Sequence, residues 1–220
     1  MPFYAAGHYL ADPNGAGLNN NAYSMAVLSY VPSIKALAHA RRRARYAERA
    51  IGSLLIAAMP TTPGARALYG VEGGKDLVAA AAGRLLPMTV LLHPSVDQVV
   101  DSLRDCSIAH FACHGYTESI DPSSSALILQ SSKGDNGPEK DMLTVHRISE
   151  LDLACAQVAY LSACSTADGS AERLSDEVIH VVSGFQVAGL PHVVGCLWPS
   201  EDRVCVEVAQ VFYAELVTRE

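Results

Sequence analysis

The sequence predicts an α/β fold in which helices cover both faces of a mostly parallel β-sheet. Short apolar runs alternate along the chain with amphipathic stretches, and this alternation is typical of strands joined by helical crossovers. The apolar runs are continuous, which indicates strands buried on both faces. The chain has 220 residues, 50% of them hydrophobic, so it can bury a large core, and we expect one domain over residues 1–220.

Seven runs have the length and apolar continuity of buried strands. They are residues 22–31, 52–59, 88–92, 107–113, 126–130, 157–164 and 192–198. Six stretches carry helical periodicity, namely residues 33–50, 74–86, 95–105, 144–151, 173–189 and 202–217. Several of these open with Ser, Thr or Asp as an N-cap, and Gly189 closes one of them. The polar segments 131–141 and 165–173 are expected to be surface loops.

Charge and hydropathy exclude several classes of partner. The chain carries a net charge of −7, and its only dense basic run, ARRRAR at residues 40–45, is most simply a solvated helix face, so no nucleic-acid partner is expected. No basic-then-apolar leader and no 18-residue apolar stretch occurs, so we expect no membrane association. The sequence therefore predicts a soluble, cytoplasmic protein.

Six cysteines are expected to be reduced thiols and not a disulfide framework, because the chain is long and shows no export signal. They are Cys106, Cys113, Cys155, Cys164, Cys196 and Cys205. Most lie in apolar contexts where cysteine behaves as a small hydrophobic residue. Cys164 differs, because it ends an apolar run just before a polar segment.

Two predicted strands end on side chains that can perform chemistry. HFACHG ends on His114 and Gly115, and LSACST ends near Cys164, fifty residues later. The carboxyl ends of parallel strands share one edge of a sheet, so neighbouring strands would bring the two side chains together. An imidazole beside a thiol activates it as a nucleophile, and Gly115 lets a carbonyl group approach.

These residues also allow other interpretations. A His or Cys at a strand end is more often structural than catalytic. A metal site built from His110, Cys113, His114 and Cys164 is disfavoured, because successive strand residues point to opposite faces. We expect neither a metal nor a cofactor.

Several motifs together resemble the CHAT domain, a caspase-like peptidase domain related to separase, and fungal members in particular. The motifs are PFYAAGHY, LSYVPSIKAL, HFACHG, LTVHRISELDLACAQVAYLSACST, VSGFQVAGLPHVVGCLWPSED and VFYAEL. They cover nearly the whole chain, and the fifty-residue interval is similar to that of caspases. The resemblance implies a caspase-like three-layer sandwich with a mostly parallel central sheet.

The resemblance implies a cysteine endopeptidase with His114 and Cys164 as its catalytic dyad. The backbone N–H groups of Gly115 and Cys164 would form the oxyanion hole, and no third catalytic residue is required. The chain departs from the caspase pattern around the nucleophile, where it has Ser-Ala-Cys-Ser-Thr, so a caspase preference for aspartate does not carry over. Tyr4 stands where many relatives have histidine.

The segment LWPSED, residues 197–202, resembles a separase stretch whose aspartate binds a substrate arginine. Carried over by position, that aspartate is Asp202, and Trp198 would form an apolar wall of the same pocket. The structural alternative is that Asp202 caps the last helix. A buried carboxylate would favour Arg before the scissile bond.

The resemblance to the CHAT domain implies a role in intracellular defence or regulated cell death. It also implies a protein or peptide substrate, and an activating partner or an upstream sensor domain. Two rival functions stay open: a catalytically silent signalling or interaction module, and a hydrolase of non-peptide acyl substrates. Relatives carry this domain behind helical repeats or another sensor, so we also expect that the chain is either truncated at its N-terminus or a free-standing catalytic domain.

Overall fold

The computed structural model describes most of the chain after residue 32. It covers residues 29, 31, 33–46, 52–68, 71, 76, 86–118, 120–131, 137–162, 177–196 and 201–218. Contacts within the chain separate Met1–Pro32 from Ser33–Glu220, and every helix and strand below belongs to the second unit. The predicted strand 22–31 and the predicted helix 74–86 lie almost wholly outside the described residues.

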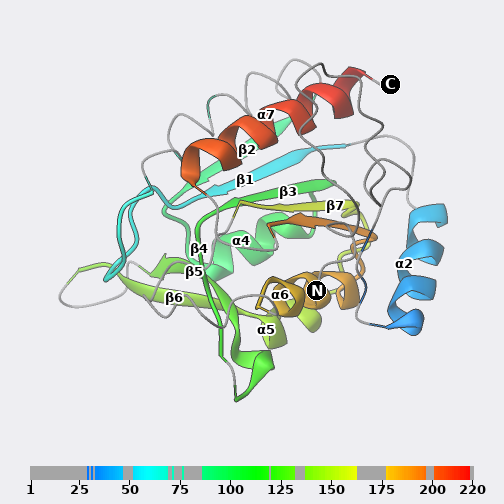
Figure 1. Cartoon of the computed structure of the whole chain (residues 1–220), viewed down its shortest axis with the longest axis horizontal. Coiled ribbons are helices and arrows are strands. Elements are labelled where there is room, and N and C mark those ends of the chain that lie inside the picture. Colours follow the sequence, from blue (N-terminus) through cyan, green and yellow to red (C-terminus); the bar gives the residue numbers. More distant parts are fainter. Residues whose placement is uncertain are drawn as a thin grey trace, which may run out of the picture. The chain divides into compact units, whose positions relative to one another are not determined.

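A five-stranded parallel sheet forms the centre of this unit (Figure 1). In spatial order its strands are β2 (Met88–Leu92), β1 (Leu54–Ala58), β3 (Ile108–Ala112), β7 (Val158–Leu161) and β8 (His192–Gly195). Every neighbouring pair in this order is parallel. All five strands lie within predicted apolar runs. The inner strands β1, β3 and β7 need apolar side chains on both faces, which accounts for their runs.

Helices cover both faces of this sheet. The described α-helices of this unit are α2 (Ile34–Tyr46), α4 (Val96–Leu103), α5 (Val145–Ser149), α6 (Glu177–Val187) and α7 (Asp202–Thr218). Val99 of α4 and Phe185 of α6 join the core on one face, whereas Tyr213 of α7 joins the core on the other. Figure 1 shows α7 and α4 on opposite sides of the strands. The predicted α/β sandwich with a mostly parallel sheet is therefore confirmed.

Several helix ends carry the predicted capping residues. The Ser95 hydroxyl accepts a hydrogen bond from the Gln98 N–H at 3.3 Å, and the Gln98 side chain accepts one from the Ser95 N–H at 2.9 Å. Thr144 caps α5, because its hydroxyl accepts a hydrogen bond from the Arg147 N–H. Gly189 follows α6 with φ of 116°, a conformation that favours glycine.

A second, antiparallel sheet extends the chain beyond the central one. It contains β4 (His114–Tyr116), β5 (Ala126–Ser131) and β6 (Glu139–Thr144), in that spatial order. The prediction that 131–141 is a surface loop is wrong for its last residues, which begin β6. Glu139 and Lys140 are exposed, so this strand lacks the apolar pattern that marks a buried one.

Strand β2 departs from the prediction that it is buried on both faces. It forms an edge of the central sheet, and Met88, Val90 and Leu92 are 37%, 39% and 50% exposed. An apolar run identifies a strand but not its place in the spatial order, so its edge position could not be predicted.

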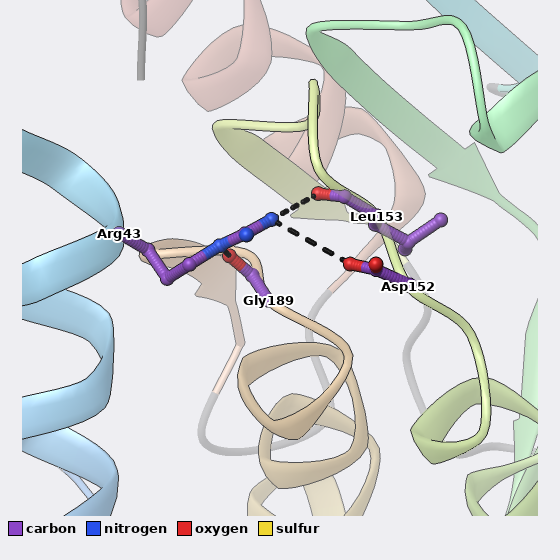
Figure 2. Close-up of polar contacts among 4 residues, drawn as sticks. All are labelled: Arg43, Asp152, Leu153 and Gly189. Carbon is purple, nitrogen blue, oxygen red and sulfur yellow. Dashed lines mark hydrogen bonds and ion pairs between the residues drawn. The ribbon is translucent and has the colours of Figure 1, made fainter. Parts of the chain in front are cut away.

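One arginine of the basic run is a structural residue. The Arg43 guanidinium donates to the carbonyl oxygens of Leu153 at 3.0 Å and Gly189 at 3.3 Å, and its Nη2 lies 4.0 Å from a carboxylate oxygen of Asp152 (Figure 2). Arg43 thereby ties α2 to the end of α6 and to the segment before β7. The exposed Arg42 fits the predicted solvated face, whereas Arg43 does not.

Among the described residues, no helix has the length and apolar character needed to span a bilayer.

Candidate active site

The segments that lead to His114 and Cys164 leave the sheet side by side. Strands β3 and β7 are hydrogen-bonded neighbours in which Phe111 lies opposite Leu161. Just beyond this pair, the Ser162 N–H donates to the Phe111 carbonyl at 2.8 Å. The prediction of adjacent central strands is confirmed. Cys164 itself lies two positions beyond Ser162, outside the described residues.

His114 is a fully buried side chain held in one orientation. It is the first residue of β4 and has 0% of its surface exposed. Its Nε2 lies 2.8 Å from the carbonyl oxygen of Arg66. A carbonyl oxygen only accepts hydrogen bonds, so Nε2 carries the proton and donates it. In the neutral ring, Nδ1 is then the nitrogen with a free lone pair.

The Nδ1 atom of His114 has no hydrogen-bond partner among the residues that the structure describes. A buried polar atom without a partner costs free energy, and such atoms are a feature of functional sites. The imidazole is therefore oriented at one nitrogen and available as a proton acceptor at the other. A general base needs this arrangement.

The carbonyl that orients His114 comes from the loop after β1. Within this loop the Leu68 N–H donates to Pro60 at 2.8 Å. The Met59 N–H donates to Ala112 at 2.8 Å, which ties the start of the loop to the end of β3. Arg66 could not be predicted from the sequence, because any residue type supplies a backbone carbonyl.

Gly115 follows His114 in β4 and is partly exposed. A Cβ atom built at this position would have the Ala126 carbonyl oxygen as its nearest neighbour, at 4.0 Å. Packing of the described fold therefore does not require a glycine here. Among the described residues other than its chain neighbours, no atom lies closer to this position than the Ala126 oxygen, which fits the predicted approach of a substrate carbonyl.

A second polar pair follows strands of the same sheet edge. Nε2 of His93, just after β2, lies 2.8 Å from the Thr61 hydroxyl, which follows β1. His93 has φ of 50°, an uncommon conformation for a residue with a side chain. The sequence does not mark His93 as a site residue, because it has no paired spacing with another histidine.

The structure does not test the two residues predicted to form the substrate pocket, Asp202 and Trp198. Helix α7 begins at Asp202, so this residue stands at the N-terminal end of the helix. The Asp202 side chain and the whole of Trp198 lie outside the described residues. The pocket assignment stays a prediction.

The sequence matches the model of a known protein family. A family model described as "CHAT domain" matches residues 1–220. The chain belongs to the CHAT domain family. This family is related to the caspase-like cysteine peptidases, which supports a protease-like fold.

Two further comparisons add little to the CHAT assignment. A search among curated proteins found no match. A flavodoxin from Streptococcus pneumoniae TIGR4 resembles this CHAT domain with a TM-score of 0.44 and 19% sequence identity, over 78% of this chain and 100% of the flavodoxin.

Two cysteines of the CHAT domain are excluded as nucleophiles by burial. Cys113 precedes His114 but is 0% exposed and belongs to the core, as predicted. Burial raises the pKa of its thiol to about 12, and the pKa of Cys106 rises to about 12 for the same reason. Both thiols stay protonated at neutral pH.

His110 has a structural role in the CHAT domain. Its ring stacks on Tyr160 at 5.0 Å between centroids, and its Nδ1 lies 3.1 Å from the Tyr213 hydroxyl. Complete burial lowers its pKa to about 4, so the ring is neutral at physiological pH. His110 packs on the α7 side of the sheet, whereas Cys113 packs on the other side.

Proposed function

We propose that this CHAT domain is a cysteine endopeptidase in which His114 and Cys164 form the catalytic dyad. The observation that carries the proposal is the buried His114 ring, whose Nε2–H donates to the Arg66 carbonyl while Nδ1 keeps its lone pair. Family membership supports the same chemistry. The adjacency of β3 and β7 supports the pairing, because His114 and Cys164 follow these two neighbouring strands in the sequence.

In this mechanism His114 first accepts a proton from the nucleophile and then donates it to the leaving group. Its Nδ1 accepts the proton of the Cys164 thiol, and the thiolate attacks the carbonyl carbon of the scissile peptide bond. The carbonyl oxygen becomes an oxyanion that accepts hydrogen bonds from the backbone N–H groups of Gly115 and Cys164. The His114 Nδ1–H then donates its proton to the leaving amine, and the C–N bond breaks.

The second half of the reaction releases the acyl group. His114 Nδ1 accepts a proton from water, whose oxygen attacks the thioester carbon of the acyl-enzyme. The C–S bond breaks and Cys164 regains its thiol. Throughout both steps the Arg66 carbonyl keeps the imidazole in the tautomer that the reaction needs and stabilises the imidazolium.

Substrate choice is assigned to Asp202 and Trp198. A buried Asp202 carboxylate would bind Arg through two parallel hydrogen bonds and reject Asp by like-charge repulsion. The test is a panel of peptides that differ only at the residue before the scissile bond. Arg should lead, and Asp202→Ala should erase that preference while Cys164 still reacts with a small alkylating agent. An unchanged profile would leave Asp202 as a residue of the first helical turn.

The biological setting follows from analogy with relatives. The peptidase would act in the cytoplasm in defence or regulated cell death, on a protein substrate. An activating partner or upstream sensor would raise a low basal activity by ordering the loops around the site. High turnover by the isolated chain would contradict this part of the proposal.

A peptidyl probe ending in an electrophile tests the activity against its rivals. We expect the probe to label Cys164, and an excess of substrate peptide to block the labelling. His114→Ala should slow the labelling by about 10²–10⁴-fold. No labelling of the folded wild-type chain would favour a silent module. Labelling that only acyl esters or thioesters block would favour a non-peptide hydrolase.

A further inference from the structure

Two thiols outside the proposed active site lie in contact. Cys196 directly follows β8, and Cys205 lies in the first turn of α7. Their Sγ atoms are 4.0 Å apart. Both are thiols, and a disulfide between them would require the side chains to turn until the sulfurs approach to about 2.05 Å.

The two thiols differ in their access to solvent. Cys196 is partly exposed, whereas Cys205 is buried. An oxidant in solution therefore reaches Cys196 first. A second thiol beside an accessible one is the arrangement of redox-sensing cysteine pairs, in which the second thiol resolves the oxidised first one.

We propose that Cys196 and Cys205 form a redox-responsive dithiol site that a peroxide closes to a disulfide, thereby tying β8 to α7. The Cys196 sulfur attacks one oxygen of hydrogen peroxide and the O–O bond breaks. The departing hydroxide takes the thiol proton, so a sulfenic acid and one water form. The Cys205 sulfur attacks the sulfenic sulfur, the S–S bond forms, and the S–O bond breaks with release of a second water. Two thiols are oxidised and one peroxide is reduced.

The disulfide would close the segment from Cys196 to Cys205. In the sequence this segment contains Trp198 and Asp202, the residues assigned to substrate binding. An effect of oxidation on substrate choice rests on the proposed function. The formation of the disulfide does not, because neither thiol belongs to the proposed dyad.

Tryptic mapping tests the proposal directly, because trypsin cuts after Arg203 and so separates the two cysteines. Cys196 falls on peptide 174–203, and Cys205 falls on peptide 204–219. The reduced full chain is treated with an equimolar amount of hydrogen peroxide, alkylated and digested without reductant. We expect these two peptides to be linked in more than half of the molecules, and dithiothreitol to separate them.

Recovery of the two peptides unlinked, with Cys196 as a sulfinic or sulfonic acid, would overturn the proposal. So would linkage of peptide 174–203 to peptide 148–173, which carries Cys155 and Cys164.

Matched variants assign the two roles. In Cys196→Ser the linked pair should disappear and Cys205 should stay reduced, because it is buried. Oxidation of Cys205 in that variant as fast as in the wild type would contradict the proposed order of reaction. Removal of the exposed thiol by Cys155→Ser should leave the linked pair unchanged. The pair should also form in Cys164→Ala, so failure of the peptidase proposal would leave this result standing.

Discussion

The Nε2 atom of His114 lies 2.8 Å from the carbonyl oxygen of Arg66, and this hydrogen bond fixes which nitrogen of the ring carries the proton. The fold makes the contact possible because the loop after β1 is tied to the end of β3, where the Met59 N–H donates to Ala112. A side-chain substitution at Arg66 leaves the carbonyl in place. The orientation of His114 therefore depends on the course of the β1 loop and not on a third catalytic side chain.

Replacement of Gly115 tests whether substrate uses the space beside β4. The space around its backbone accommodates a methyl group, so Gly115→Ala should change the free energy of unfolding by no more than about 0.5 kcal/mol. The same methyl group would obstruct the substrate carbonyl, and peptide cleavage should fall at least ~10-fold. Chemical denaturation and kcat/KM are measured on the same preparation. Full activity in Gly115→Ala would remove this residue from the site.

Replacement of Cys113 tests whether this residue contributes to stability or to catalysis. Its side chain is buried in the core, so Cys113→Ala should lower the free energy of unfolding by about 1–2 kcal/mol. Cleavage per folded molecule should be unchanged, because the thiol stays protonated and faces the core. A Cys113→Ala variant that keeps wild-type stability but has lost activity would contradict this assignment and give the Cys113 thiol a role in the reaction.

Arg43 should stabilise the fold although it belongs to a basic surface run. Arg43→Ala removes the hydrogen bonds to Leu153 and Gly189 and should lower the free energy of unfolding by about 2 kcal/mol. The neighbouring Arg42 is exposed, so Arg42→Ala should change it by no more than about 0.5 kcal/mol. Equal effects of the two substitutions in urea denaturation would refute the structural role of Arg43.

Buried His110 should make stability depend on pH. Burial lowers its pKa from 6.5 to about 4, so between these values the unfolded chain binds a proton that the folded chain refuses. The stabilisation is complete above pH 6.5 and is lost as pH falls toward 4. Between pH 7 and 4.5 the wild type should lose about 2–3 kcal/mol more than His110→Phe, which keeps a ring to stack on Tyr160. Identical pH profiles would contradict the assignment.

Much of the fold could be predicted from sequence, and what could not has physical reasons. Strands β1, β3 and β7 stand out because both faces are buried, whereas β6 is a half-exposed strand with polar residues. The apolar run of β2, residues 88–92, does not indicate that this strand lies at an edge of the sheet. Position in the sheet depends on long-range pairing, which residue type alone does not specify.

In the candidate site, too, one residue could be predicted from the sequence and its contacts could not. His114 was identified because a histidine followed by glycine at the end of an apolar run is chemically distinctive. Its partner at Nε2 is a backbone carbonyl, which any residue at position 66 would supply. The contact of Cys196 with Cys205 was equally hidden, because a spacing of nine residues across a strand end and a helix start has no periodic signature.

The central claim is that His114 and Cys164 together cleave peptide bonds, and the most direct measurement is the mapping of new protein N-termini. A proteome is incubated with the wild-type chain, with Cys164→Ala and with His114→Ala, each shown to be folded by circular dichroism. We predict a set of new N-termini in the wild-type sample, reduced by about 10²–10⁴-fold for His114→Ala and absent for Cys164→Ala. The same N-termini at wild-type levels in the Cys164→Ala sample would contradict the account.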